Sequence, residues 1–116
     1  SRLARPNGGL APTSTHKAPT MQDTISKAAQ DVLAERERQI SQEGWTPEHD
    51  DGHRNGQMAD AAACYASTKH IDHLLWPWSR EWLKPSDRRR NLVKAGALIL
   101  AEIERLDRAS YSANGV

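Results

Sequence analysis

Hydrophobic residues recur at helical spacing in three stretches of the chain, and no segment alternates convincingly with the period of two that a half-buried strand shows. This pattern predicts main helices over about 22–43, 55–69 and 86–108. We therefore expect an all-α domain of three main helices, joined by two long loops that carry tryptophans.

The first predicted helix has an apolar face interrupted by polar residues. The apolar positions are Ile25, Ala29, Val32, Leu33 and Ile40. Arg36 falls near the centre of this face, and Gln39 lies at one edge. Because an unpaired buried charge is costly, Arg36 must pair with a carboxylate of the following loop or line a polar ligand pocket. The sequence leaves both alternatives open.

The limits of the first helix and the loop after it follow from residues that favour helix ends. Thr20 or Asp23 can cap the start, and Gly44 supplies a stop. Thr46 followed by Pro47 is typical of an N-cap and first helical position, which predicts a short helical turn in the loop.

The second helix is rich in alanine and is expected to pack closely against its neighbour. Its predicted inner face consists of Met58, Ala61, Ala62 and Tyr65. In the loop that follows, over 70–86, Ser79 can cap a turn that sets Trp78 and Trp82 one turn apart.

The third helix, with Ser86 or Asp87 as its cap, is apolar nearly all round in its middle. One side carries a strong stripe of Leu92, Val93, Gly96, Ile99, Leu100, Ile103 and Leu106, and the other carries Ala97, Leu98 and Ala101. This pattern is typical of a central helix, or of one buried again in a homo-oligomer.

The two ends of the chain differ from the helical domain. Residues 1–20 are rich in Pro, Gly, Ser and Thr and predict an extended or disordered arm. The domain then covers 21–109, with a frayed tail over 110–116, and Met21 is a candidate natural start. No signal peptide or membrane-spanning run is recognisable.

The formal net charge of +1 argues against nucleic acid as the main partner, because duplex binders carry a strong basic bias. The run Arg88-Arg89-Arg90 fits a solvated face. The single cysteine, Cys64, excludes an internal disulfide and reads as a core residue, so we expect a reducing cytoplasm.

Candidate chemistry concentrates in the loops. All four tryptophans lie between residues 45 and 82, and the chain has no phenylalanine. Indole rings stack on flat ligands such as nucleobases, but they can also close one end of a thin bundle. The segment His49-Asp50-Asp51 with His53 has metal-ligand composition, yet its spacing fits no specific site, so we expect a solvent-facing cap and neither metal nor cofactor. No nucleophile motif or phosphate-binding loop occurs, and we predict no catalytic residue.

Residues 31–107 resemble a group of phage and prophage proteins. The shared segments are Ala34-Glu35-Arg36, Gln39-Ile40, Glu43 to Asp51, Ala61 to Ala66, Trp76-Pro77-Trp78, Trp82 to Pro85 and Arg88 to Asp107. This resemblance covers most of the domain and carries no activity with it. It implies the cytoplasm of an infected bacterial host.

The chain also resembles the RyR domain, the repeat of ryanodine receptors that occurs in bacteria and phages as well. Arg36 precedes Gly44-Trp45, an acidic Asp50 or Asp51 follows, and Asp87-Arg88 opens the last helix. The family's Pro-Leu segment after the Gly-Trp loop is missing. RyR domains are ligand-recognition modules, and some prokaryotic versions are thought to sense nucleotide-derived signals.

Together the two resemblances imply a phage-encoded sponge that sequesters a nucleotide-derived immune signal. Stacking is expected from Trp45, Tyr65 or Trp82, and phosphate contacts from Arg36, Lys84 and Arg89. The full predicted ligand-binding set is Arg36, Gln39, Trp45, His49, Asp50, Tyr65, Trp82, Lys84 and Arg89.

Two alternatives belong to other classes. The last helix resembles that of MazG-type nucleoside triphosphate pyrophosphohydrolases, but Gln57, Asn91 and Lys94 stand where that family's magnesium-binding acids are wanted. A protein-binding inhibitor is the other alternative, acting through the N-terminal arm or through Lys94, Leu98, Ala101 and Arg105 of the last helix. The same surface of that helix is the candidate interface of a homodimer.

Overall fold

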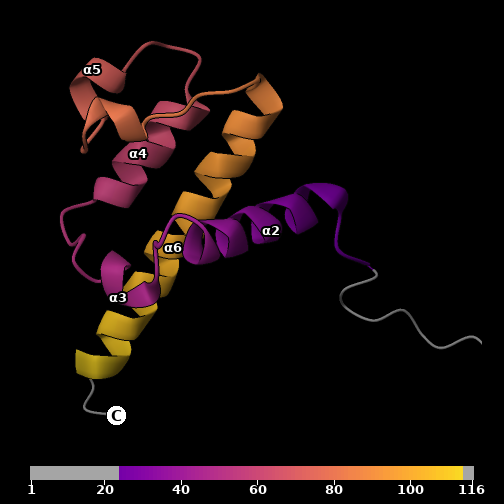
Figure 1. Ribbon diagram of the computed structural model, residues 1–116. Helices are drawn as coiled ribbons and strands as arrows, with labels where there is room; N and C mark the ends of the chain where they lie inside the picture. The colour runs from indigo at the N-terminus through magenta and orange to yellow at the C-terminus, as the bar shows by residue number, and fades with distance from the viewer. Residues whose placement is uncertain (1–23, 114–116) are drawn as a thin grey trace, which may run out of the picture.

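The computed structural model describes residues 24–113, and these form helices and no strand (Figure 1). The elements in chain order are α2 (Lys27–Ser41), α3 (Pro47–Asp50), α4 (Gln57–Ala66), α5 (Asp72–Leu75), the 3-10 helix η1 (Arg80–Trp82) and α6 (Arg88–Ala113). The three long helices α2, α4 and α6 match the three predicted ones. The expectation of an all-α fold is therefore confirmed for the described residues.

Helix α6 is the central element. Helices α2, α3 and α4 all pack against it, with α2 crossing it and α4 lying along its N-terminal half (Figure 1). The loop containing α5 and η1 returns from the end of α4 to the start of α6. None of the described helices combines the length and the apolar character that crossing a membrane requires.

Small side chains make up most of the core between α4 and α6. The predicted inner face of α4, Met58, Ala61, Ala62 and Tyr65, is buried as expected. Ala61, Ala62 and Tyr65 of this face form one cluster with Ala95 and Leu98 of α6, and Ala101 of α6 is also buried. Because alanine has only a methyl group, the two helices can approach closely, and the larger Met58 and Leu98 fill the space that remains.

The crossing of α2 and α6 depends on a glycine. A Cβ atom placed on Gly96 would lie 3.1 Å from Cγ2 of Val32, closer than an ordinary contact. Around this point the buried residues of α2 are polar: Glu35, Arg36 and Gln39 are buried, while Ala29 and Leu33 are exposed. The apolar face predicted for this helix is therefore wrong in part. The side that faces the rest of the fold is the one that carries Glu35, Arg36 and Gln39, and not the one that carries Ala29 and Leu33.

The helix ends show where local signals were sufficient. The hydroxyl of Thr46 accepts from the backbone N–H of His49 at 3.2 Å, and Pro47 opens α3, as predicted. Ser26 caps α2 by accepting from the N–H of Ala29 at 3.1 Å, so the helix begins later than expected. Thr20 and Asp23, the caps we predicted, lie outside the described residues.

The last helix starts as predicted but continues further. A carboxylate oxygen of Asp87 accepts from the N–H of Arg90 at 2.9 Å and caps α6, whereas the helix was expected to end near residue 108. It continues to Ala113, into the segment predicted to fray. Helix α4, by contrast, stops at Ala66, where an end at Lys69 was expected.

The structure shows which side of α6 faces the rest of the fold. Four residues of the predicted stripe are about half exposed: Leu92, Ile99, Ile103 and Leu106. The thin helix α4 instead packs on the small-residue side, where Leu98 and Ala101 are buried and Arg105 is 9% exposed. The predicted partner surface of Lys94, Leu98, Ala101 and Arg105 is therefore wrong, because α4 covers most of it.

Candidate functional site

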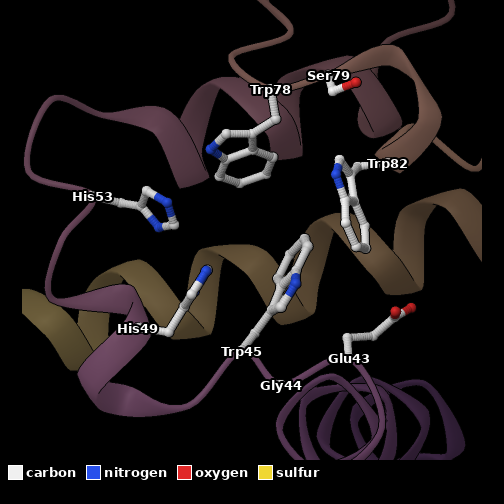
Figure 2. Close-up of a pocket in the computed structure, with 8 residues that line it drawn as sticks. All are labelled: Glu43, Gly44, Trp45, His49, His53, Trp78, Ser79 and Trp82. Carbon is white, nitrogen blue, oxygen red and sulfur yellow. The ribbon is translucent and has the colours of Figure 1, made fainter.

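A cleft of about 370 Å³ opens between the turn after α2 and the loop before α6 (Figure 2). Its lining residues are Glu43, Gly44, Trp45, His49, His53, Trp78, Ser79 and Trp82. We call it the tryptophan cleft. Its volume lies within the range of roughly 300–1,000 Å³ that is usual for small-molecule sites.

Trp45 is fixed from the α2 side. Gly44 adopts a left-handed backbone with φ of 77°, a conformation that a side chain would oppose, and it turns the chain out of the helix. The N–H of Trp45 then donates to the carbonyl of Gln39 at 3.0 Å. Arg36 donates to the carbonyl of Trp45 at 3.3 Å. The backbone N–H and the backbone carbonyl of Trp45 are thus both held by hydrogen bonds.

The opposite wall is a series of edge-to-face rings that reaches the core. Trp78 packs edge to face on Trp45, where the two walls touch, with ring centroids 5.3 Å apart, and on Trp76 with ring centroids 5.4 Å apart. Trp76 packs in turn on the buried Tyr65 at 5.8 Å, and its indole N–H donates to the carbonyl of Ser79 at 3.0 Å. Such pairs prefer these edge-on arrangements, so Trp78 is a rigid wall.

Trp82 lies at the open side of the cleft and is 45% exposed (Figure 2). It ends η1, and the ammonium of Lys84 lies 5.6 Å from its ring centroid. The N–H of Lys84 donates to the hydroxyl of Tyr65 at 3.0 Å, which ties this loop to α4. The cleft therefore has a half-exposed indole and a cation side by side at its rim.

Two imidazoles form the remaining side. His49 lies parallel to Trp45 with centroids 6.4 Å apart, and His53 contacts Trp78 at 5.1 Å. The two imidazoles meet edge to face at 4.9 Å. Burial, followed by the neighbouring His49, lowers the pKa of His53, which favours the neutral ring that can accept as well as donate.

Behind the histidines lies a buried ion pair. Arg36 donates to Oδ2 of Asp50 at 2.9 Å, and the side chains are 6% and 1% exposed. Arg36 also donates to Glu104 at 3.1 Å. Burial raises the pKa of Asp50, and the charge and hydrogen bond of Arg36 oppose that rise. Of the two alternatives for Arg36, pairing with a loop carboxylate is confirmed, and Arg36 does not line the cleft.

Three other predicted site residues surround a separate small cavity. Gln39, Tyr65 and Lys84 line a space of about 20 Å³ that shares Trp45 and Trp82 with the cleft. Oε1 of Gln39 is buried there without a hydrogen-bond partner. A space of this size and polarity fits one water molecule, which needs at least roughly 10–15 Å³.

The predicted residues thus fall into distinct places. The tryptophan cleft brings together Trp45, His49 and Trp82, whereas Asp50 lies beneath His49. Arg89 is elsewhere, paired with Asp31 at 2.9 Å between α6 and α2. Sequence reasoning missed Trp78, His53, Glu43 and Ser79 as lining residues, although the spacing of His53 four residues after His49 was a usable signal.

Other candidate chemistry finds no support in these contacts. Burial raises the pKa of the Cys64 thiol, which disfavours a reactive thiolate. Asn91 bonds the backbone of Ser86, and Lys94 donates to the carbonyl of Lys84, at positions where a pyrophosphohydrolase would need acids. Comparison of the chain with models of known families, with curated proteins and with solved structures gives no match.

Proposed function

We propose that this protein binds a small nucleotide-derived molecule in the tryptophan cleft and sequesters it without changing it chemically. The observation that carries the proposal is the half-exposed indole of Trp82 at the mouth of a cleft that Trp45 and Trp78 also line. A flat base can stack on such a surface, and indoles are well suited to this because they are large and rigid.

The polar groups at the cleft define what the rest of the ligand looks like. Lys84 does not itself line the cleft, but its ammonium lies beside two residues that do, 5.6 Å from the Trp82 ring centroid and 4.0 Å from Oε1 of Glu43, so it is the candidate phosphate contact. Glu43, which pairs with Arg38 at 3.2 Å, can accept from ribose hydroxyls or a base amino group. Arg36 and Arg89 do not line the cleft, so a ligand there meets fewer cations than we expected from the sequence. This favours a base with one or two phosphates over a polyphosphate.

Sequestration rather than catalysis follows from the same residues. The cleft offers aromatic surface, imidazoles and one carboxylate, and it is lined by no cysteine. Its one serine, Ser79, donates at 3.4 Å to the exposed carboxylate of Glu81 and to neither of the two imidazoles, so no activated nucleophile faces the cleft. The biological role that we attach to this proposal is the one implied by the resemblance to phage proteins, namely removal of a nucleotide signal in an infected bacterium.

Intrinsic tryptophan fluorescence and calorimetry test the proposal directly. The panel consists of adenosine, AMP, GMP, ADP-ribose, and cyclic mono- and dinucleotides. We expect at least one to bind with micromolar affinity and to be recovered unchanged after incubation. Trp82→Ala should weaken binding at least about tenfold, since stacking on an aromatic residue contributes roughly 1–3 kcal/mol per base.

The matched control is Tyr111→Ala, because Tyr111 is an exposed aromatic residue that is not among the lining residues of the cleft. Its affinity should equal that of the parent protein. Absence of binding across the panel, or equal loss in both variants, would contradict the proposal. Release of pyrophosphate from a nucleoside triphosphate in magnesium would instead favour the pyrophosphohydrolase alternative.

A further inference from the structure

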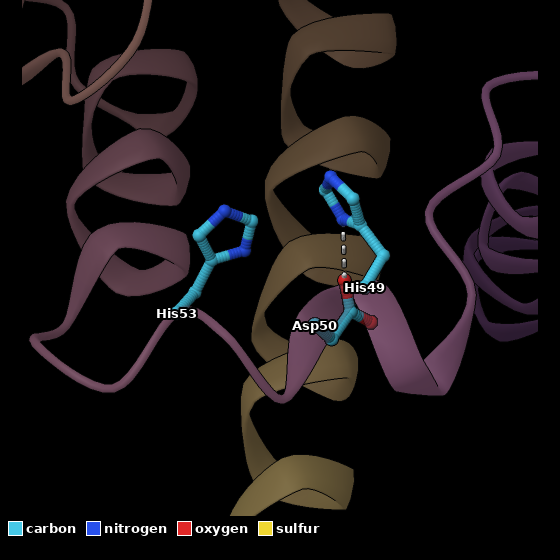
Figure 3. Close-up of side chains that lie close together, drawn as sticks. All are labelled: His49, Asp50 and His53. Atoms are coloured by element: carbon cyan, nitrogen blue, oxygen red, sulfur yellow. Dashed lines mark ion pairs between the residues drawn. The ribbon is translucent and has the colours of Figure 1, made fainter.

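The end of α3 and the loop after it bring three metal-ligating side chains together (Figure 3). His49, Asp50 and His53 each offer a donor atom, and these atoms all lie within 4.8 Å of one another. Asp50 follows His49 directly in α3, and His53 returns towards them after the turn at Gly52. Within the described residues this is the one such group of three or more His, Cys, Asp or Glu donors.

Two donor atoms of the group are buried without a hydrogen-bond partner. They are Oδ1 of Asp50, whose side chain is 1% exposed, and Nδ1 of His53. Nδ1 of His49 lies 3.8 Å from Oδ1 of Asp50, which is too long for a hydrogen bond (Figure 3). Buried polar atoms in proteins nearly always have a hydrogen-bond partner. Two such atoms that lack one at the same place therefore indicate that another group binds there.

We propose that His49, Asp50 and His53 bind a divalent transition-metal ion, of which Zn²⁺ is the best match. Two imidazoles and one carboxylate select zinc, nickel or cobalt over magnesium or calcium, which prefer oxygen ligands. Donors around a tetrahedral zinc ion lie roughly 3.4 Å apart for bonds of about 2.05 Å. Closing from 4.8 Å needs about one ångström of side-chain movement.

The surroundings allow that movement and compensate the charge. The side chain of His49 is 49% exposed, so half of its surface has no neighbour to oppose a shift, while Asp50 is fixed because Arg36 holds its other oxygen. Arg36 also pairs with Glu104, so one guanidinium serves two carboxylates. The surplus negative charge is what a divalent cation would neutralise. Arg105, the other cation near His53, is paired with Glu102 at 2.7 Å. Arg36 thus acts as the outer group that orients a ligand.

The location of the site decides its use. His49 and His53 line the tryptophan cleft, so a metal held by three protein donors would face the bound molecule. Three protein ligands with one position left for a small molecule is the pattern of open zinc sites, in contrast to closed structural ones. A phosphate or carbonyl oxygen of the ligand can supply the fourth donor.

Calorimetric titration of the full chain with Zn²⁺, after dialysis against a chelator, tests the site. We expect one ion per chain, with binding weakened at least about tenfold in His49→Ala and in His53→Ala. Co²⁺ should give the strong visible absorption of a four-coordinate site, and that absorption should be lost in both variants. Mg²⁺ should not compete.

The control lacks the other histidines, His16, His70 and His73, each replaced by alanine, and should bind zinc as the parent does. Far-UV circular dichroism checks that every variant remains helical. Zinc binding that survives in the His49→Ala/His53→Ala protein, or that is lost in the control, would overturn the site. Zinc binding without any nucleotide binding would keep the metal site and remove the proposed function, so the two failures are distinguishable.

A second inference rests on the exposed side of α6. Leu92, Ile99 and Leu106 recur every seven residues and are 44%, 47% and 52% exposed, with Ile103 beside them at 48%. Such a repeat is the pattern of a helix that pairs with another helix. It is symmetric about Ile99, because a leucine stands seven residues away on each side.

We infer that two copies of the chain pair through antiparallel α6 helices centred on Ile99. This arrangement places Leu92 opposite Leu106 of the second copy, as a two-fold interface requires.

Light scattering on the full chain tests the dimer. We expect a mass near twice the 12.9 kDa of one chain, and a mass near 12.9 kDa for Ile99→Glu. Leu74→Glu is the matched control, since Leu74 is 73% exposed on α5, and it should stay dimeric. A monomeric parent at tens of micromolar, or equal dissociation of both variants, would overturn this inference.

Discussion

Arg36 and Asp50 lie fourteen residues apart in the sequence and form a buried ion pair, with Nη2 of Arg36 2.9 Å from Oδ2 of Asp50. The pair joins α2 to α3, and through Glu104 it also reaches α6. Helix α3 is only one turn long, and its one buried residue is Asp50. The ion pair with Arg36 therefore holds the first loop in place, as apolar packing would hold a longer helix.

Removing one partner of this pair should be far more costly than removing both. Arg36→Leu leaves the carboxylate of Asp50 buried and uncompensated, and we expect a loss of about 3–5 kcal/mol in the free energy of unfolding. Arg36→Leu/Asp50→Asn should lose less than the sum of the single changes. Urea denaturation of the four proteins measures this coupling, and strictly additive losses would show that the pair does not act as a unit.

Glu35 should make stability depend on acid. Its side chain is 1% exposed and bonds Arg38 at 2.8 Å and also Arg90. Burial alone would raise the pKa of Glu35, but the bonds and charges of Arg38 and Arg90 lower it below the usual 4.5. A lowered pKa in the folded state means that this stabilisation is complete above about pH 4.5 and is lost as the pH falls through the folded value.

Glu35→Gln removes charge-assisted hydrogen bonds to two arginines and should lose about 2 kcal/mol at pH 7. It should also unfold with a weaker pH dependence below 4.5, because the group with the lowered pKa is gone. Thermal unfolding between pH 7 and pH 3 compares the two proteins. Glu37→Gln is the matched control, since Glu37 lies on the exposed side of the same helix. Parallel stability curves for all three proteins would contradict the assignment.

Gly96 should resist replacement even though it lies inside a helix. Alanine there would gain up to about 1 kcal/mol of helix propensity, but its methyl group would lie 3.1 and 3.2 Å from the two methyl groups of Val32. Valine is rotationally stiff in a helix, so we expect the clash to prevail and Gly96→Ala to lose about 1 kcal/mol. In a Val32→Ala protein these two methyl groups are gone, so adding Gly96→Ala should make that protein more stable than Val32→Ala alone. Denaturation midpoints decide this.

Tyr65→Phe should loosen the Trp82 loop without unfolding the protein. The Tyr65 hydroxyl accepts from the N–H of Lys84, and no other described hydrogen bond reaches that N–H. We expect a loss of about 1 kcal/mol in unfolding free energy and faster hydrogen exchange over 80–85. Unchanged exchange in that segment would show that the loop is held by its indoles alone.

Local signals were enough to predict some elements. Thr46 and Pro47 are sufficient to predict the one-turn helix α3. The Thr46 hydroxyl caps its first turn, and the ring of Pro47 fixes φ at a value that suits the first helical position. The inner face of α4 was also predictable, since its two largest apolar side chains, Met58 and Tyr65, stand on the same side of the helix. These predictions needed no knowledge of the neighbouring helices.

The orientation of α6 and the contents of the cleft were not predictable in this way. Leu98 and Ile99 are equally apolar, and only the close approach of an alanine-rich partner decides that Leu98 goes inside. Likewise, no spacing rule brings Trp78 against Trp45, because they belong to loops whose paths depend on Tyr65 and Trp76. Tertiary contacts therefore decide both features.

The two walls of the tryptophan cleft come from segments on either side of α4 in the sequence, which touch where Trp45 meets Trp78. One wall belongs to the chain before α4 and the other to the chain after it, so any molecule that contacts both Trp45 and Trp82 would act as a cross-link. Occupancy should then slow solvent exchange in both loops together and raise the melting temperature in proportion to the logarithm of ligand concentration above the dissociation constant. Thermal shift would thus rank unknown ligands before any of them is identified chemically.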